Sequence, residues 1–249
     1  MGFTIGAISG LSGIREIRDL RPGARRREHA QVCTTVAEYT SLWGWDVVPG
    51  ARAVRSGTRV TCSCGAGACP APGDHPLDAT LEVPAGATLD EATRAWAQVP
   101  GAAMLLPTGR AFDVLEVAGC AGRCALVRLE RMGVPLGPVA ETPHGRAWFL
   151  VAPGAAAELP ELLYRMGWDD ADLDLRGRGE GEHITAPPSD LAGLGAVHWL
   201  RPPTLETAGR PPQARLLLGT LAYVCHRSAL ARPRAAGDDA VAKDAEDNS

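Results

Sequence analysis

Two short apolar segments near the middle of the chain constrain the fold most. Residues 102–106 and 112–118 both have the composition of buried strands, and Pro107-Thr108-Gly109 between them is typical of a turn. Strands joined by so few residues fit best as an antiparallel hairpin. We therefore expect a sheet with antiparallel pairs rather than a doubly wound parallel sheet.

Helical patterns flank and separate these strands. Apolar residues recur at three- and four-residue steps from His29 to Trp43, and Gly44 ends the pattern. Thr88 and Glu91 form a capping box at the start of another helix. Further helices are expected over residues 121–132 and 159–166, and after Pro211, where Leu217, Leu221 and Val224 share one face.

The remaining strand patterns are short. They cover residues 45–48, 146–151, 173–175 and 183–186, and we expect the last two to pair across a Gly-rich turn. Together with the helices they predict an α+β fold, with a mixed, largely antiparallel sheet and flanking helices.

Composition indicates one domain with a charged segment at each end. With 45% hydrophobic residues in 249, the chain can bury a substantial core, which we place at residues 28–230. Residues 1–27 are rich in arginine and residues 231–249 in acids, and we interpret both as disordered tails, although a basic arm could contact phosphates. The net charge of −4 argues against an indiscriminate polyanion binder. The sequence shows neither a long apolar run nor the pattern of a secretory signal, so we expect a cytoplasmic protein without a membrane partner.

A loop rich in Gly, Pro and Cys over residues 55–78 contains a candidate metal site. Cys62, Cys64, Cys69 and His75 lie within it. Three thiolates and one imidazole are an accepted ligand set for structural zinc, and a reducing cytosol disfavours disulfides. Reduced thiols without a metal are the alternative. The other cysteines lack such neighbours: we expect Cys33 and Cys225 to fill the core.

Three segments in a fixed order resemble one known family. They are FDVLEVA at residues 112–118, TPHGRAWFLV at 142–151 and LDLRGRGEGEHITAPPS at 173–189. Together they resemble the bifunctional DNA primase/polymerase (prim-pol) family of the archaeo-eukaryotic primase superfamily. The resemblance implies two acids on a first strand, a His on a second and an Asp on a third, which hold divalent metals and a triphosphate. The cysteine loop also resembles an insertion of that family, with Asp74 in place of its usual Lys.

The resemblance places some family positions on unsuitable residues. The first strand has Glu116 but Ala118 at the second acid, the second strand has Trp148 at the His, and the third has Asp174. An indole could stack on a base, or it could simply fill the core. Four residues are candidates for nucleotide or phosphate contacts: His144, Gly145, Arg146 and Arg176. A structural pair between Asp174 and Arg176, and an exposed strand-end position for Arg146, are the simpler interpretations.

Three functions follow from this mixture. The first is a prim-pol domain with a degenerate, inactive nucleotidyl-transfer site that binds a nucleotide or single-stranded DNA. The second is an active enzyme that uses Mg²⁺ or Mn²⁺ at a rearranged site, with Asp113 or Glu141 joining Glu116 and Asp174. Asp113 lies three residues from Glu116, so an extended strand would turn it to the opposite face. The third is a zinc-stabilised interaction protein that keeps only the fold.

Overall fold

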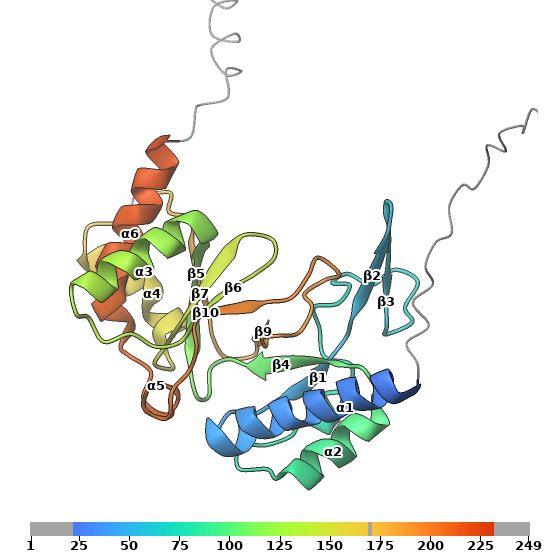
Figure 1. Cartoon of the computed structure of the whole chain (residues 1–249). Helices are drawn as coiled ribbons and strands as arrows, with labels where there is room; N and C mark the ends of the chain where they lie inside the picture. Colours follow the sequence, from blue (N-terminus) through green and yellow to red (C-terminus); the bar gives the residue numbers. More distant parts are fainter. Residues whose placement is uncertain (1–21, 169–170, 232–249) are drawn as a thin grey trace, which may run out of the picture.

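The computed structural model describes residues 22–168 and 171–231, which form two main sheets with helices outside them (Figure 1). Every strand pair in these residues is antiparallel, so the predicted α+β class is confirmed. Most of the basic segment at residues 1–27, and the acidic residues after Ala231, lie outside the described residues. Helix α1 (Pro22–Ala37) begins inside the range that we assigned to the basic tail.

The larger sheet has five strands in the order β10-β6-β7-β5-β8. In that order they span His198–Arg201, Val139–Glu141, Arg146–Val151, Asp113–Ala118 and Leu175–Arg178. Because side chains alternate along a strand, Leu115 and Val117 pack together against one layer of helices, whereas Val114 and Glu116 face away from it. That layer consists of α3 (Gly119–Arg131), α4 (Ala155–Arg165) and α6 (Ala214–Ala231), which lie together at the left of Figure 1.

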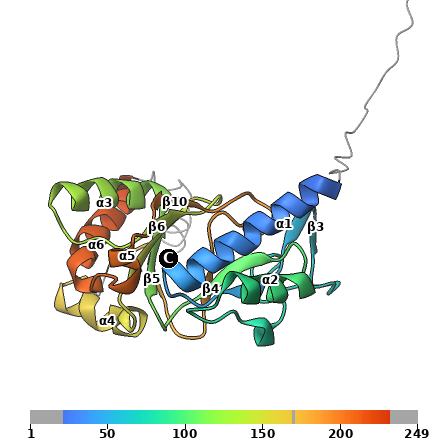
Figure 2. The same ribbon diagram turned by 60° about the horizontal axis from the view of Figure 1, so that its bottom comes forward.

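The smaller sheet has three strands in the order β1-β4-β9, spanning Val48–Gly50, Ala103–Pro107 and His183–Thr185. Helix α1, its π-helical continuation η1 (Glu38–Leu42) and α2 (Leu89–Gln98) lie alongside it (Figure 2). A second apolar cluster joins Tyr39, Trp45 and Trp96 of this half to Val114 and Trp148 of the larger sheet. The shared core therefore fixes the open face of the larger sheet, meaning the face without helices, against the smaller half.

Four short elements complete the described fold. Strands β2 (Ala53–Ser56) and β3 (Arg59–Cys62) form a hairpin, η2 (Ala79–Leu81) is a 3₁₀ turn, and α5 (Leu205–Gly209) precedes α6. The hairpin corrects part of our prediction of an irregular loop over residues 55–78.

Two predictions from local sequence patterns, a helix cap and the buried face of the last helix, are confirmed. The Thr88 backbone N–H donates to a Glu91 carboxylate oxygen at 2.8 Å, and the Glu91 N–H donates to the Thr88 hydroxyl at 3.4 Å, so the capping box is confirmed. Leu217, Leu221 and Val224 are all buried on α6, as predicted. The last helix itself begins at Ala214, a few residues after Pro211.

Strand partners were predicted less well. The expected hairpin over residues 102–118 is wrong, because β4 pairs with β1 and β9, whereas β5 pairs with β7 and β8. The expected pair over residues 173–186 is wrong for the same reason, since β8 and β9 belong to different sheets. Gly109, with a φ of 90° and its N–H bonded to the Phe112 carbonyl, turns the chain from one sheet into the other. The strand predicted at residues 45–48 shifts to β1.

Candidate functional site

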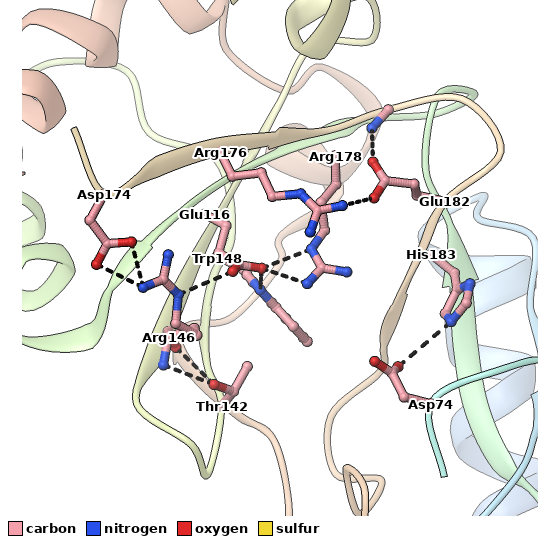
Figure 3. A network of polar contacts seen from close by, with 11 residues as sticks. Asp74, Glu116, Thr142, Arg146, Trp148, Asp174, Arg176, Arg178, Glu182 and His183 are labelled. Carbon is pink, nitrogen blue, oxygen red and sulfur yellow. Dashed lines mark hydrogen bonds and ion pairs between the residues drawn. The ribbon is translucent and has the colours of Figure 1, made fainter. Parts of the chain in front are cut away.

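Glu116 is the centre of a polar cluster on the open face of the larger sheet (Figure 3). It lies on β5 directly opposite Trp148 of β7 and Arg176 of β8. One carboxylate oxygen accepts the Trp148 indole N–H at 2.8 Å and two Arg178 contacts at 2.7 and 2.8 Å. The other oxygen accepts from Arg146 Nε at 3.1 Å. Donors from two neighbouring strands therefore occupy both oxygens of Glu116.

Arg146 joins Glu116 to the second candidate acid, Asp174. Its Nη1 lies 2.7 and 2.8 Å from the two Asp174 carboxylate oxygens, while its Nε contacts Glu116. A tight turn holds this arginine at the start of β7: the Arg146 N–H donates to the Thr142 hydroxyl at 2.9 Å, and Gly145 has a φ of 78°. The guanidinium thus bridges the carboxylate of Glu116 on β5 and that of Asp174 just before β8.

The third strand contributes two more arginines. Arg178, at i+2 from Arg176 on β8, holds Glu116, and its guanidinium lies 5.7 Å from the Trp148 ring centroid. Arg176 instead pairs with Glu182, at 2.5 Å. The predicted pair between Asp174 and Arg176 is therefore wrong, because Asp174 pairs with Arg146 and Arg176 pairs with Glu182.

These contacts stabilise the charged forms of Glu116 and Arg146 in a partly buried site. Burial alone would raise the pKa of the Glu116 carboxyl, but Arg178, the Trp148 indole and Arg146 together hold the pKa below its ordinary value. Burial likewise opposes the charge of Arg146, yet Asp174 and Glu116 raise its pKa. Three arginines face three acids here, so the cluster is electrically balanced.

Two acids proposed for a rearranged site lie on the wrong face. Asp113 accepts the Ala156 N–H at 2.8 Å and so caps the first turn of α4, within the helical layer. Glu141, opposite Ala147, pairs with Arg123 of α3 in the same layer. Neither carboxylate can reach Glu116 through the sheet, so the rearranged set that includes Asp113 or Glu141 is wrong.

Comparison with protein-family models identifies the family of this chain. The model of the family "Bifunctional DNA primase/polymerase, N-terminal" matches residues 36–214, which is most of the chain. This chain belongs to the Prim-Pol family. The match marks it as a primase/polymerase-type nucleic-acid protein. Neither the search of curated proteins nor the search of solved structures gave a significant match.

The Prim-Pol positions named from the sequence do come together. Glu116 of β5 bonds directly to Trp148 of β7, and Arg146 joins it to Asp174, which directly precedes β8. Trp148 is 2% exposed, however, so its ring packs in the core and cannot stack on a base. Arg146 is half-buried rather than an exposed strand end. Their family roles stay predictions.

His144 lies at the turn before β7, as predicted, and is exposed. Desolvation of its ring, together with Arg146 and Arg178, lowers its pKa against the opposing effect of Glu116 and Asp74. The neutral form is therefore favoured at neutral pH, which weakens its proposed phosphate contact. Across the shared core, His183 of β9 lies 3.6 Å from Asp74 of the cysteine loop.

Sequence reasoning missed Arg178, Glu182 and the Asp74–His183 contact. The signal for Arg178 was present, since Arg176 and Arg178 are two residues apart on one strand and so share a face. Glu182 follows a Gly-rich turn whose path was not predictable. Its second oxygen accepts the Gly179 N–H at 3.2 Å, which places the side chain beside Arg176.

The four predicted metal ligands also converge. One ligand atom from each of Cys62, Cys64, Cys69 and His75 lies within 4.8 Å of the others, so the cluster could bind a metal such as zinc. His75 Nδ1 lies 2.8 Å from the Pro76 carbonyl, and this contact orients Nε2 toward Cys62, 3.3 Å away. A histidine ligand is commonly oriented in this way through its other nitrogen.

The electrostatics of the loop favour a thiolate. Although burial opposes it, the backbone N–H groups of Cys64 and Gly73 and the His75 ring lower the pKa of Cys62 to about 6. Thiolates are the form of cysteine that binds metals.

Cys33 and Cys225 are buried in the core as predicted, and Cys120 and Cys124 are exposed. In the described part of the chain, no helix combines the length and apolar character needed to cross a membrane.

Proposed function

We propose that this chain is a nucleic-acid-binding member of the Prim-Pol family whose nucleotidyl-transfer centre is inactive. One observation carries the proposal: Arg146 bridges Glu116 and Asp174, the two acids that remain at the family positions. Nucleotidyl transfer needs two cations about 3.5–4 Å apart, held by carboxylates. Here a guanidinium occupies the space between the carboxylates.

The charge balance of the cluster supports this conclusion. A divalent cation would have to displace Arg146 from both carboxylates, and Arg178 would still hold Glu116 at 2.7 Å. A triphosphate would meet arginines whose charges are already neutralised by Glu116, Asp174 and Glu182. Both reactants would therefore have to break ion pairs before binding.

The remaining family positions offer no compensation. Ala118 has no ligand atom, and the Trp148 N–H already donates to Glu116. A second metal ligand and the imidazole contact to the triphosphate are both replaced. Loss of such groups costs several kcal/mol each in transition-state stabilisation, so we expect activity near background.

A primer-synthesis assay tests the proposal. The protein is incubated with a single-stranded DNA template, labelled nucleotides and Mg²⁺ or Mn²⁺, and both new primers and extension of a preformed primer are measured. We expect no incorporation above that of heat-inactivated protein. The matched variant is Arg146→Gly with Ala118→Asp and Trp148→His, which restores the family residues. Metal-dependent incorporation by the unmodified protein that disappears in Glu116→Ala would overturn the proposal.

We also propose that Cys62, Cys64, Cys69 and His75 bind a structural zinc ion. Four protein ligands close the coordination sphere, which is typical of structural rather than catalytic zinc. Such a site fits the reducing cytoplasm in which we place the protein. Binding of single-stranded DNA distinguishes the proposed nucleic-acid-binding protein from a zinc-stabilised interaction protein, because only the nucleic-acid-binding protein requires a polynucleotide partner.

A further inference from the structure

The hairpin β2–β3 lies in an acid-free part of the sequence. Residues 47–73 contain three arginines and no Asp or Glu. At the chain's average of 29 acidic residues in 249, a stretch of this length would hold about three. The balanced cluster around Glu116 offers little free positive charge, so this segment is a better candidate for contact with a polyanion.

Both faces of the hairpin are exposed. In β2 only Ala53 is buried, and β3 has no buried residue. Val54 is 64% exposed, and the tip between Ser56 and Arg59 is exposed throughout. Figure 1 shows the two strands projecting beyond the rest of the smaller half. A two-stranded ribbon of this kind contributes little to a core, so packing does not explain its sequence.

The arginines of the hairpin differ from those of the larger sheet. Among the described residues, Arg52, Arg55 and Arg59 make no ion pair with a carboxylate, whereas Arg146, Arg176 and Arg178 all do. The Arg55 Nε donates only to the Ala192 carbonyl, at 2.8 Å. The positive charges of the ribbon are therefore not neutralised by neighbouring acids.

The base of the hairpin is held firmly. Arg52 and Ser63 exchange two hydrogen bonds, at 2.8 and 2.9 Å, across its open end. Cys62, the last residue of β3, belongs to the Cys/His cluster. Farther along the same loop, the Ala51 N–H donates to the His75 carbonyl at 2.8 Å. The ribbon therefore projects in a fixed direction from the candidate metal site.

We propose that the β2–β3 ribbon binds the phosphate backbone of a nucleic acid through Arg52, Arg55 and Arg59. Arginine, serine and threonine side chains are common donors to phosphate oxygens, and all three types occur in this ribbon. Such contacts are independent of base sequence and release counterions, so they weaken as salt rises. The inference rests on the proposed function, since it names the surface through which this Prim-Pol domain contacts its polynucleotide.

Salt-dependent binding tests the ribbon. Fluorescence anisotropy with a fluorescein-labelled, single-stranded DNA of mixed sequence measures the affinity of the full chain at several salt concentrations, and a duplex of the same sequence is a second probe. In R55Q/R59Q we expect roughly 10-fold weaker binding, and a slope of log affinity against log salt that is shallower by about 1.4 for the single strand. Tighter binding of the wild type to the duplex than to the single strand, together with a larger loss of duplex affinity in R55Q/R59Q, would identify double-stranded nucleic acid as the preferred ligand.

The matched control is R215Q/R227Q on α6. Both arginines are exposed and, in the described residues, make no ion pair, so the change in net charge is the same. We expect wild-type affinity and salt slope, and thermal melting verifies that both variants fold. If the wild type binds and R55Q/R59Q keeps its affinity and slope, the ribbon proposal is wrong; its arginines then serve only to block edge-to-edge pairing. If the wild type binds neither probe, the proposed function itself fails.

Discussion

The sheet site and the cysteine loop both gather residues that can bind metals, but they arrange them differently. In the loop, four ligand atoms lie within 4.8 Å of one another. On the sheet, Glu116 and Asp174 each contact Arg146 instead. A guanidinium thus lies between the two acids on the sheet, whereas the four side chains of the loop face one another directly.

The two sites also differ in how they depend on the fold. The loop takes all four ligands from residues 62–75, so short-range geometry brings them together. The sheet site takes Glu116 from β5, Arg146 from β7 and Asp174 from the segment just before β8. We therefore expect metal binding to order the loop, whereas folding of the sheet alone creates the arginine cluster.

The largest predicted effect is the loss of zinc when one metal ligand of the cysteine loop is removed. Cys62→Ser removes one of four ligands and the thiolate favoured by its surroundings, so we expect zinc content to fall from about one ion per chain to near zero. Elemental analysis after purification without added metal measures it, and hydrogen exchange should show faster opening of residues 53–76. Cys120→Ser is the matched control, because Cys120 is exposed on α3 outside the cluster. A folded wild-type protein with less than about 0.2 zinc per chain would contradict the prediction.

The next effect tests whether Arg146 stands in for a cation. Arg146→Ala leaves Glu116 and Asp174 with less positive charge, and we expect a loss of about 2–3 kcal/mol in unfolding free energy, since the pair is only partly buried. Mn²⁺ should recover part of that loss in the variant but leave the wild type unchanged. Thermal or urea unfolding with and without Mn²⁺ measures both effects.

Arg165→Ala is the control for that experiment. Arg165 and Glu161 form an exposed pair on α4, so its loss should cost less than about 0.5 kcal/mol, with no response to Mn²⁺. If Mn²⁺ stabilises the wild type as much as Arg146→Ala, then the guanidinium does not exclude the metal and the two sites differ less than we infer.

The sequence was most informative where the signal was local. The capping box at Thr88 and Glu91 depends on residues three apart, and the Cys/His cluster on one loop, so both could be predicted. Glu116 and Asp174 were also placed on one face correctly, because family spacing carried long-range information that strand patterns lack.

The failures concern choices between distant partners. Strand β4 is buried along most of its length and lies between β1 and β9, yet nothing in residues 102–118 indicates that those strands, rather than β5, are its neighbours. Asp174 and Arg176 are two residues apart, but in the fold Asp174 pairs with Arg146 and Arg176 pairs with Glu182. The local sequence indicates neither partner, because Asp174 precedes β8 and Glu182 follows a turn.

The smallest effect is the pH dependence of the sheet site. The folded-state pKa of Glu116 lies below its ordinary value of 4.5, so its ionised form stabilises the fold above that pH. This contribution is lost as the pH falls through the depressed pKa. Glu116→Gln lacks the charge at every pH, and the difference in unfolding free energy between wild type and variant should therefore be largest at neutral pH and shrink below pH 4.5. Other acids are common to both proteins and largely cancel, and the exposed Glu161→Gln should show a smaller difference throughout. A wild-type advantage that stayed constant from neutral to acid pH, or grew in acid, would mean that the arginines do not hold Glu116 as a carboxylate, and the contrast with the cysteine loop would lose its electrostatic basis.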